Sequence, residues 1–212
     1  VKEPARCACA LARQMAEWRP DGLLRRLEHG IPPRKRQALE TMMERHVHCP
    51  ATSSMGRLFD AVAFWCGFDG AAGCEGHAAM VLESWAASLP EDGPEGDSYE
   101  WVMHEEGGLL ELDWRPVLKA LNDDLLAGVS RCRIARKFHE SLVNLVFDVA
   151  ERFSQDRLVL GGGCFQNAFL LEGLMGMAQS RACVLSLPQR VPCNDGGISL
   201  GQAAAAVRQW KG

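Results

Sequence analysis

The stretch RLVLGGGCFQNAFLLEGL, residues 157–174, decides the fold of this chain. A short apolar run leads into Gly161, Gly162 and Gly163, and apolar residues at helical spacing follow at once. Consecutive glycines between a strand and a helix let the backbone approach a ligand or a neighbouring element closely. The run matches neither G-x-G-x-x-G nor G-x-x-x-x-G-K-[ST]. It therefore indicates either a phosphate-binding turn or a tight connection made for packing, and packing is the simpler interpretation.

A second glycine turn, NDGGISLGQA at residues 194–203, follows another short apolar run in the same way. Asp195 precedes the two glycines, where it either caps the next helix or presents a carboxylate to a metal. Strand, helix, strand and helix in succession predict an α/β arrangement with parallel strands. We expect both turns to lie together at the carboxyl ends of these strands.

Upstream of this region the pattern is mainly helical. Residues 1–50 read as helices, and another helix begins near Ser53 or Ser54. Asp60 lies in it at the edge of an apolar face, where an acid is either solvated or hydrogen-bonded to a ligand such as a ribose. Residues 90–98 form a polar loop, and the runs YEWVMH and LLELDW around a Gly-Gly pair predict a β-hairpin. Helical periodicity then returns as far as residue 153.

The bulk composition is that of an ordinary globular protein. The 212 residues carry a net charge of −4, and the basic residues cluster only at 25–36 and 131–137, so we expect solvated helix faces and no nucleic-acid partner. No apolar run is long enough for a membrane span, and no signal-peptide pattern is present. Nine scattered cysteines without a C-x-x-C motif indicate a reduced, cytoplasmic protein.

Four stretches together resemble the carboxy-terminal part of the HypF-type carbamoyltransferases, which are hydrogenase maturation enzymes. They are PATSSMGRLFDAVAFWCGF (50–68), EGHAAMVLE (75–83), LVLGGGCFQNAFLL (158–171) and VPCNDGGISLGQA (191–203), and KEPAR (2–6) and IARKFHESL (134–142) are also similar. The resemblance implies a helix-rich α/β fold, the second lobe of an actin/Hsp70-like, ribonuclease-H-like ATPase fold. We expect a helical lead-in at 1–50 and the lobe at 51–212, with a helical and β-hairpin insertion at about 90–128.

The resemblance also implies an activity. Such enzymes use carbamoyl phosphate and ATP, form a carbamoyl-adenylate, and transfer the carbamoyl group to the carboxy-terminal cysteine of a partner maturation protein, which supplies cyanide to the nickel–iron centre. By the same resemblance, the ribose contacts are Asp60, Glu75 and Gly76, and the adenylate turn is Gly162, Gly163 and Asn167. Asp195 corresponds to the family's carboxy-terminal ligand for a divalent metal, whether Fe, Mg or Zn.

The chain departs from the family in ways that bear on activity. None of its six histidines forms the H-x-x-x-H pair of the family's metal site, and the glycine-rich DGTG turn of the first lobe is absent. With its first residue a valine, the chain resembles a second lobe that lacks the amino-terminal part of the enzyme, and we expect it to be inactive alone. Two alternatives stay open: a catalytically incomplete adenylate-binding or scaffold lobe, and a carbamoyltransferase that acts on a small-molecule hydroxyl.

Overall fold

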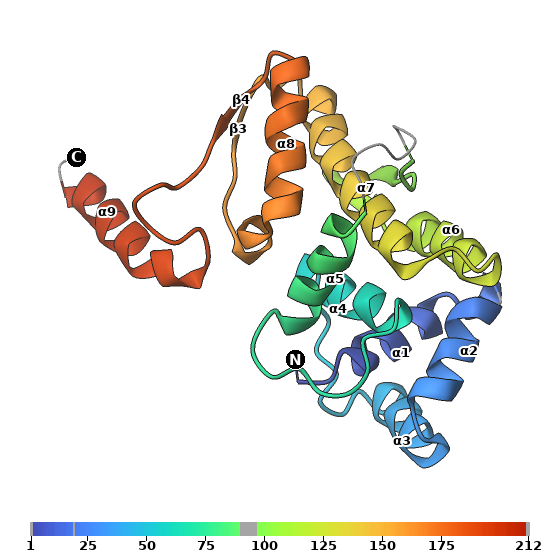
Figure 1. The fold of residues 1–212 in the computed structure, drawn as a ribbon. Coiled ribbons are helices and arrows are strands. Elements are labelled where there is room, and N and C mark those ends of the chain that lie inside the picture. Colours follow the sequence, from blue (N-terminus) through green and yellow to red (C-terminus); the bar gives the residue numbers. More distant parts are fainter. Residues whose placement is uncertain (1, 19, 90–96, 211–212) are drawn as a thin grey trace. The chain divides into compact units, whose positions relative to one another are not determined.

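In the computed structural model, which describes residues 2–18, 20–89 and 97–210, the chain divides within one long helix into two compact units, 1–142 and 143–212 (Figure 1). The predicted loop at 90–98 therefore lies mostly outside the described residues. The helices of the predicted lead-in segment pack in unit 1, where α1 contacts α4. The predicted boundary at residue 50, between the helical lead-in and the lobe, stays a prediction.

Unit 1 consists of helices and one hairpin. Its elements are α1 (Pro4–Gln14), η1 (Ala16–Trp18), α2 (Asp21–Gly30), α3 (Pro33–Glu44), α4 (Met55–Trp65), α5 (His77–Ala87), β1 (Val102–Glu106), β2 (Leu109–Asp113), α6 (Arg115–Leu126) and the first half of α7 (Arg131–Arg152). Pro4 is tolerated in the first turn of α1 because that turn's N–H groups have no intrahelical partner. The unit follows the predicted order of elements, hairpin included.

The core of unit 1 surrounds α4. All residues from Leu58 to Trp65 are buried, so this helix is apolar around nearly its whole circumference, as a central helix requires. The ring of Phe59 meets the ring of Phe138 on α7 edge to face, with 5.1 Å between centroids. His139 is fully buried beside the same phenylalanine. Helix α4 thereby fixes α1, α5 and the start of α7 around one core.

The hairpin forms where the sequence predicts it. Strands β1 and β2 pair antiparallel, with Val102 opposite Asp113 and Glu106 opposite Leu109. The two connecting residues, Gly107 and Gly108, both have positive φ, which suits the two-residue turns that match strand twist.

The basic cluster at residues 131–137 begins α7 and forms ion pairs within unit 1. Arg133 and Lys137 both pair with Asp97.

Unit 2 has the predicted strand–helix–strand–helix order. After the second half of α7 its elements are β3 (Arg157–Val159), η2 (Gly163–Gln166), α8 (Ala168–Ser180), β4 (Val184–Ser186), η3 (Asp195–Gly197) and α9 (Ile198–Trp210). Strands β3 and β4 are parallel, with Leu158 opposite Leu185. Helix α8 contacts β4, and Leu170, Leu174 and Ala178 on that helix are buried. The helix-rich α/β fold predicted from the sequence is thus confirmed.

No helix in the described part of the chain has the length and apolar character that crossing a bilayer requires.

Candidate functional site

The glycine turn after β3 is open and exposed. Gly162 has φ +113°, a conformation that L side chains rarely adopt, and a Cβ built at Gly161 or Gly162 would meet no atom within 4 Å. A short 3-10 helix, η2, lies between the turn and α8, where the sequence predicted a direct strand-to-helix turn. Close packing therefore does not require glycine at 161 or 162, whereas the backbone conformation requires it at 162, so both interpretations of the triple glycine stay open.

Asn167 performs a structural role at the start of α8. Its side-chain oxygen accepts a hydrogen bond from the backbone N–H of Leu170 at 2.8 Å, and the residue is buried. This is an N-cap, which satisfies one of the unpaired N–H groups in the first turn. The predicted adenylate contact by this side chain stays a prediction, and its oxygen already serves the helix.

The second glycine turn is joined to the first. The backbone N–H of Gly162 donates to the carbonyl oxygen of Cys193 at 2.6 Å, and the side-chain amide of Asn194 donates to that of Gln166 at 3.2 Å. Both turns follow the carboxyl ends of the parallel strands β3 and β4. The predicted juxtaposition of the two turns is therefore present in unit 2.

The cap of the second turn is not the residue that the sequence suggested. Asn194, rather than Asp195, accepts a hydrogen bond from the N–H of Gly196, at 3.0 Å, so the capping role considered for Asp195 is wrong. Asp195 is exposed, and its carboxylate is not the cap. Gly197 is required here because a Cβ would lie 2.6 Å from the carbonyl oxygen of Pro192.

Asp60 lies inside unit 1 and not at a solvated edge. The residue is 4% exposed. Its carboxylate pairs with Arg57 at 3.0 Å, and the thiol of Cys7 lies 4.0 Å from the same oxygen. Burial raises the pKa of this carboxyl, and the charge of Arg57 opposes that shift. Asp60 is thus a buried carboxyl group that pairs with a basic neighbour one helical turn away.

The Glu75–Gly76 turn precedes α5 and is exposed. Gly76 occupies the left-handed region with φ +74°, which glycine adopts without strain. His77 braces the turn, because its Nδ1 accepts a hydrogen bond from the N–H of Gly73 at 3.1 Å and its ring meets that of Phe68 edge to face. The ring of His77 thus has a local structural role.

The site residues predicted from the sequence fall in both units. Asp60, Glu75 and Gly76 belong to unit 1, whereas Gly162, Gly163, Asn167 and Asp195 belong to unit 2. The structure brings the second set together through the joined turns. That one nucleotide contacts both sets stays a prediction.

The described residues do not form a metal site by themselves. No group of three or more His, Cys, Asp or Glu side chains in the described ranges lies close enough to hold a metal ion. Asp195 offers one carboxylate, whereas divalent cations take about four to eight ligands. Metal binding by Asp195 stays a prediction that requires ligands from outside this set.

Sequence reasoning missed three residues that support the site. Asn194 and Gln166 join the two turns, and Arg57 holds Asp60. Asn194 was detectable, because asparagine two residues before a glycine at a helix start is as good a cap as aspartate. Arg57 was detectable as well, because it stands three residues before Asp60 on one helix face. The contact of Gln166 depends on tertiary structure and has no local signal.

Known proteins match the chain over most of its length. Residues 1–202 match the family model for carbamoyltransferase, Kae1-like domain, second subdomain. The Carbamoyltransferase HypF of a Synechocystis species is 37% identical over 159 residues, which cover 75% of this chain and 20% of that protein. The Carbamoyltransferase HypF homolog of Cupriavidus necator is 34% identical and covers 99% of this chain and 54% of that protein. The chain thus spans from a fifth to about half of the length of these relatives.

Solved structures of HypF also match the chain. A crystal structure of full-length HypF in the phosphate- and nucleotide-bound form matches 100% of this chain and 27% of that protein, with a TM-score of 0.84 and 29% identity. The HypF of T. kodakarensis matches 80% of this chain with a TM-score of 0.63 and, at 23% identity, supports the fold alone. The resemblance to HypF-type carbamoyltransferases is confirmed, and the chain belongs to the family of the carbamoyltransferase Kae1-like domain, second subdomain.

Proposed function

We propose that this chain provides one wall of the nucleotide site of a HypF-type carbamoyltransferase. The observation that carries the proposal is the hydrogen bond from Gly162 to Cys193, which joins two exposed glycine turns at the carboxyl ends of parallel strands. Ligands in α/β folds bind at such strand ends. The family membership supports the reaction class, which is carbamoyl transfer. The open glycine turn supports the proposal that the chain holds the phosphate-bearing part of the substrate.

The glycine turn suits a phosphate-bearing group for a physical reason. No Cβ shields the backbone at Gly161 and Gly162. Because the N–H of Gly162 donates to Cys193, the N–H of Gly161 is the backbone group of this pair that anionic oxygens can reach. In the proposed site the Gly161 N–H contacts the adenylate phosphate. The carboxylate of Asp195 lies in the adjoining turn, and a metal held there with ligands from outside the described residues would act as a Lewis acid on the carbamoyl end.

The proposed reaction has two stages. In the first, water cleaves carbamoyl phosphate to carbamate and inorganic phosphate, and a carbamate oxygen attacks the α-phosphorus of ATP, so that carbamoyl-adenylate forms and pyrophosphate leaves. In the second, a thiolate attacks the carbamoyl carbon, so that a C–S bond forms while the bond to the adenylate oxygen breaks and AMP leaves. The acceptor is the carboxy-terminal cysteine of a hydrogenase maturation protein. The chain's part is to orient the adenylate and not to supply the nucleophile.

The proposed contacts to the ribose are residues of unit 1. Glu75 is exposed and stands before Gly76 at the start of α5, where its carboxylate is accessible to a hydroxyl. Asp60 is ion-paired with Arg57, so a ribose contact would use the carboxylate's remaining acceptor positions. Glu75 is therefore the stronger candidate of the two.

Calorimetry with ATP and Mg²⁺ tests the proposal. The chain should bind ATP, and Gly162→Val should lower the affinity by at least about tenfold, because the side chain covers the turn and distorts its backbone. Gly128→Val is the matched control, because Gly128 also has positive φ and open space but belongs to unit 1 and to neither turn. ATP binding that Gly162→Val leaves unchanged would contradict the assignment. No binding at millimolar ATP would favour the scaffold alternative.

A further inference from the structure

The hairpin of unit 1 has an open backbone edge along β2. The turn between its strands has two residues, so Glu106 and Leu109 beside it exchange their backbone hydrogen bonds. Bonded pairs alternate with non-bonded pairs in an antiparallel ladder, so Leu110 and Leu112 direct their N–H and C=O groups away from β1. Within the described ranges the sheet has two strands, and these outward groups have no hydrogen-bond partner there. The hairpin therefore offers a template for a third strand.

The two faces of β2 differ in chemistry. Leu110 and Leu112 are half-buried on one face, whereas Leu109 and Glu111 are exposed on the other. Side chains that point the same way on neighbouring strands lie side by side, so a strand added at this edge continues both faces. Apolar residues of the added strand then extend the half-buried leucine row, and the alternate residues come within reach of the Glu111 carboxylate.

The charge of the hairpin determines which strand fits this edge. Residues 100–113 contain five acidic residues and no Lys or Arg. Asp113 pairs with Arg115, whereas Glu106 and Glu111 are exposed and have no ion-pair partner in the described part of the chain. Opposite charges on neighbouring strands attract each other, and like charges repel. The charge therefore disfavours pairing with the hairpin of a second copy and favours a strand that carries Lys or Arg.

We propose that the outer edge of β2 binds an extended segment of a partner protein in which basic and apolar residues alternate. The backbone groups of Leu110 and Leu112 form the ladder hydrogen bonds to this segment. Glu111 pairs with one of its basic side chains. Strand addition of this kind gains affinity through the backbone and specificity through alternate side chains. Neither glycine turn of unit 2 takes part, so the inference stands independently of nucleotide binding.

Fluorescence anisotropy with a labelled synthetic peptide tests the proposal. The probe is an octapeptide of alternating lysine and valine with both ends blocked, and the protein is the complete chain. We expect saturable binding, and Glu111→Lys should weaken it about tenfold, because attraction across the strands becomes repulsion. Glu28→Lys is the matched control, because Glu28 is exposed on α2 of unit 1 and its substitution changes the net charge equally. It should change the affinity by less than about twofold.

Methylated peptides separate strand addition from attraction between charges alone. Methylation of every valine backbone nitrogen blocks antiparallel addition, and methylation of every lysine backbone nitrogen blocks parallel addition, while the charge stays the same. At least one of the two versions should bind at least about tenfold more weakly than the unmodified peptide.

Four outcomes would overturn the proposal. They are no saturable binding at millimolar peptide, equal affinity of all three peptides, and equal effects of Glu111→Lys and Glu28→Lys. The fourth is a dimer of the chain without peptide that Leu110→Pro dissociates, because a second copy then occupies the edge. Proline suits this test because the N–H that it removes points away from β1, so the pairing of β1 with β2 is kept.

Discussion

The backbone N–H of Gly162 donates a hydrogen bond to the carbonyl oxygen of Cys193, with 2.6 Å between nitrogen and oxygen. The two residues lie 31 positions apart in the sequence, and the bond ties the turn after β3 to the turn after β4. Only a residue that tolerates φ +113° can present its N–H in this way. The geometry of both turns thus depends on the glycine at this position.

Gly162→Ala should lower the free energy of unfolding by about 1–3 kcal/mol, because a side chain is strained at this φ. Gly161→Ala is the matched control, since Gly161 has the same open surroundings without a positive φ, and it should change stability by less than about 0.5 kcal/mol. Urea denaturation of the three proteins measures the difference. Equal effects of the two substitutions would refute the conformational argument.

The caps of unit 2 give a second prediction. Asn167→Ala removes the oxygen that accepts from Leu170, so it should cost about 1 kcal/mol of stability, whereas Asn167→Asp keeps an acceptor and should cost less. Thermal denaturation followed by circular dichroism reports both. If Asn167→Asp is as unstable as Asn167→Ala, the side chain does not act as a cap. Asn167→Ala could lose ATP binding only because α8 is less stable. Asn167→Asp, which keeps the cap, separates this effect from loss of a direct contact with the nucleotide.

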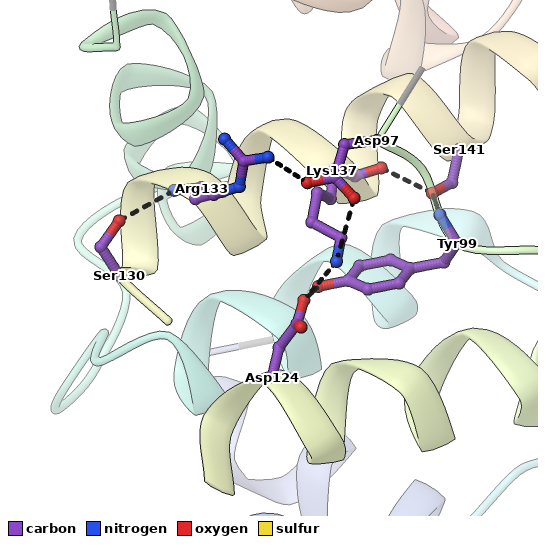
Figure 2. Close-up of polar contacts among 7 residues, drawn as sticks. All are labelled: Asp97, Tyr99, Asp124, Ser130, Arg133, Lys137 and Ser141. Atoms are coloured by element: carbon purple, nitrogen blue, oxygen red, sulfur yellow. Dashed lines mark hydrogen bonds and ion pairs between the residues drawn. The ribbon is translucent and has the colours of Figure 1, made fainter. Parts of the chain in front are cut away.

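A polar cluster in unit 1 makes the only tyrosine of the chain a spectroscopic probe (Figure 2). The Tyr99 hydroxyl donates to Asp124 at 2.7 Å, and Lys137 pairs with the same carboxylate at 2.7 Å. The backbone N–H of Tyr99 donates to the hydroxyl of Ser141. Burial, and then the hydrogen bond to Asp124, raise the pKa of Tyr99 far above its usual range.

Alkaline titration should therefore show no tyrosinate absorbance near pH 10 while the protein is folded. An unfolded tyrosine ionises near pH 10, so stability should fall as the pH rises above that value, and the absorbance should appear together with unfolding. Absorbance near 295 nm and circular dichroism, recorded on the same samples, test this. A tyrosinate signal near pH 10 in a protein with native circular dichroism would show that the phenol is not held in this cluster.

His139 predicts an acid-side pH dependence. The ring is fully buried, its Nδ1 lies 2.7 Å from the carbonyl oxygen of Ala135, and burial lowers its pKa to about 4. The unfolded chain binds this proton near pH 6.5, so the unfolded state is favoured as the pH falls from 6.5 towards 4. The loss is on the order of 3 kcal/mol, and none is expected from this group above pH 7.

The matched comparison for His139 is His139→Gln, which retains a hydrogen-bonding side chain and does not titrate in this range. The difference in unfolding free energy between wild type and variant should change between pH 7 and pH 4 by the amount above. Urea denaturation at several pH values measures it. A constant difference across this range would mean that the buried histidine does not govern the acid sensitivity.

Local patterns in the sequence predicted most of the secondary structure. The apolar periodicity of α4 and α7 and the Gly-Gly pair of the hairpin are signals contained within a few neighbouring residues. The juxtaposition of the two turns was predictable for another reason: parallel strands place their carboxyl ends at the same edge of a sheet.

Features that depend on tertiary packing were not predictable. Asp60 looked like an edge residue, but α1 covers α4 and buries it. The link between Gln166 and Asn194 joins residues 28 positions apart, and no local pattern encodes it.

Hydrogen–deuterium exchange with and without saturating ATP and Mg²⁺ tests most directly whether the joined turns hold a nucleotide. We predict slower exchange in peptides that cover 161–167 and 193–197, because bound phosphate oxygens accept hydrogen bonds from their N–H groups. The hairpin at 102–113 should be unchanged and serves as the internal reference. Unchanged exchange in both turns at nucleotide concentrations that saturate the chain by calorimetry would contradict the account.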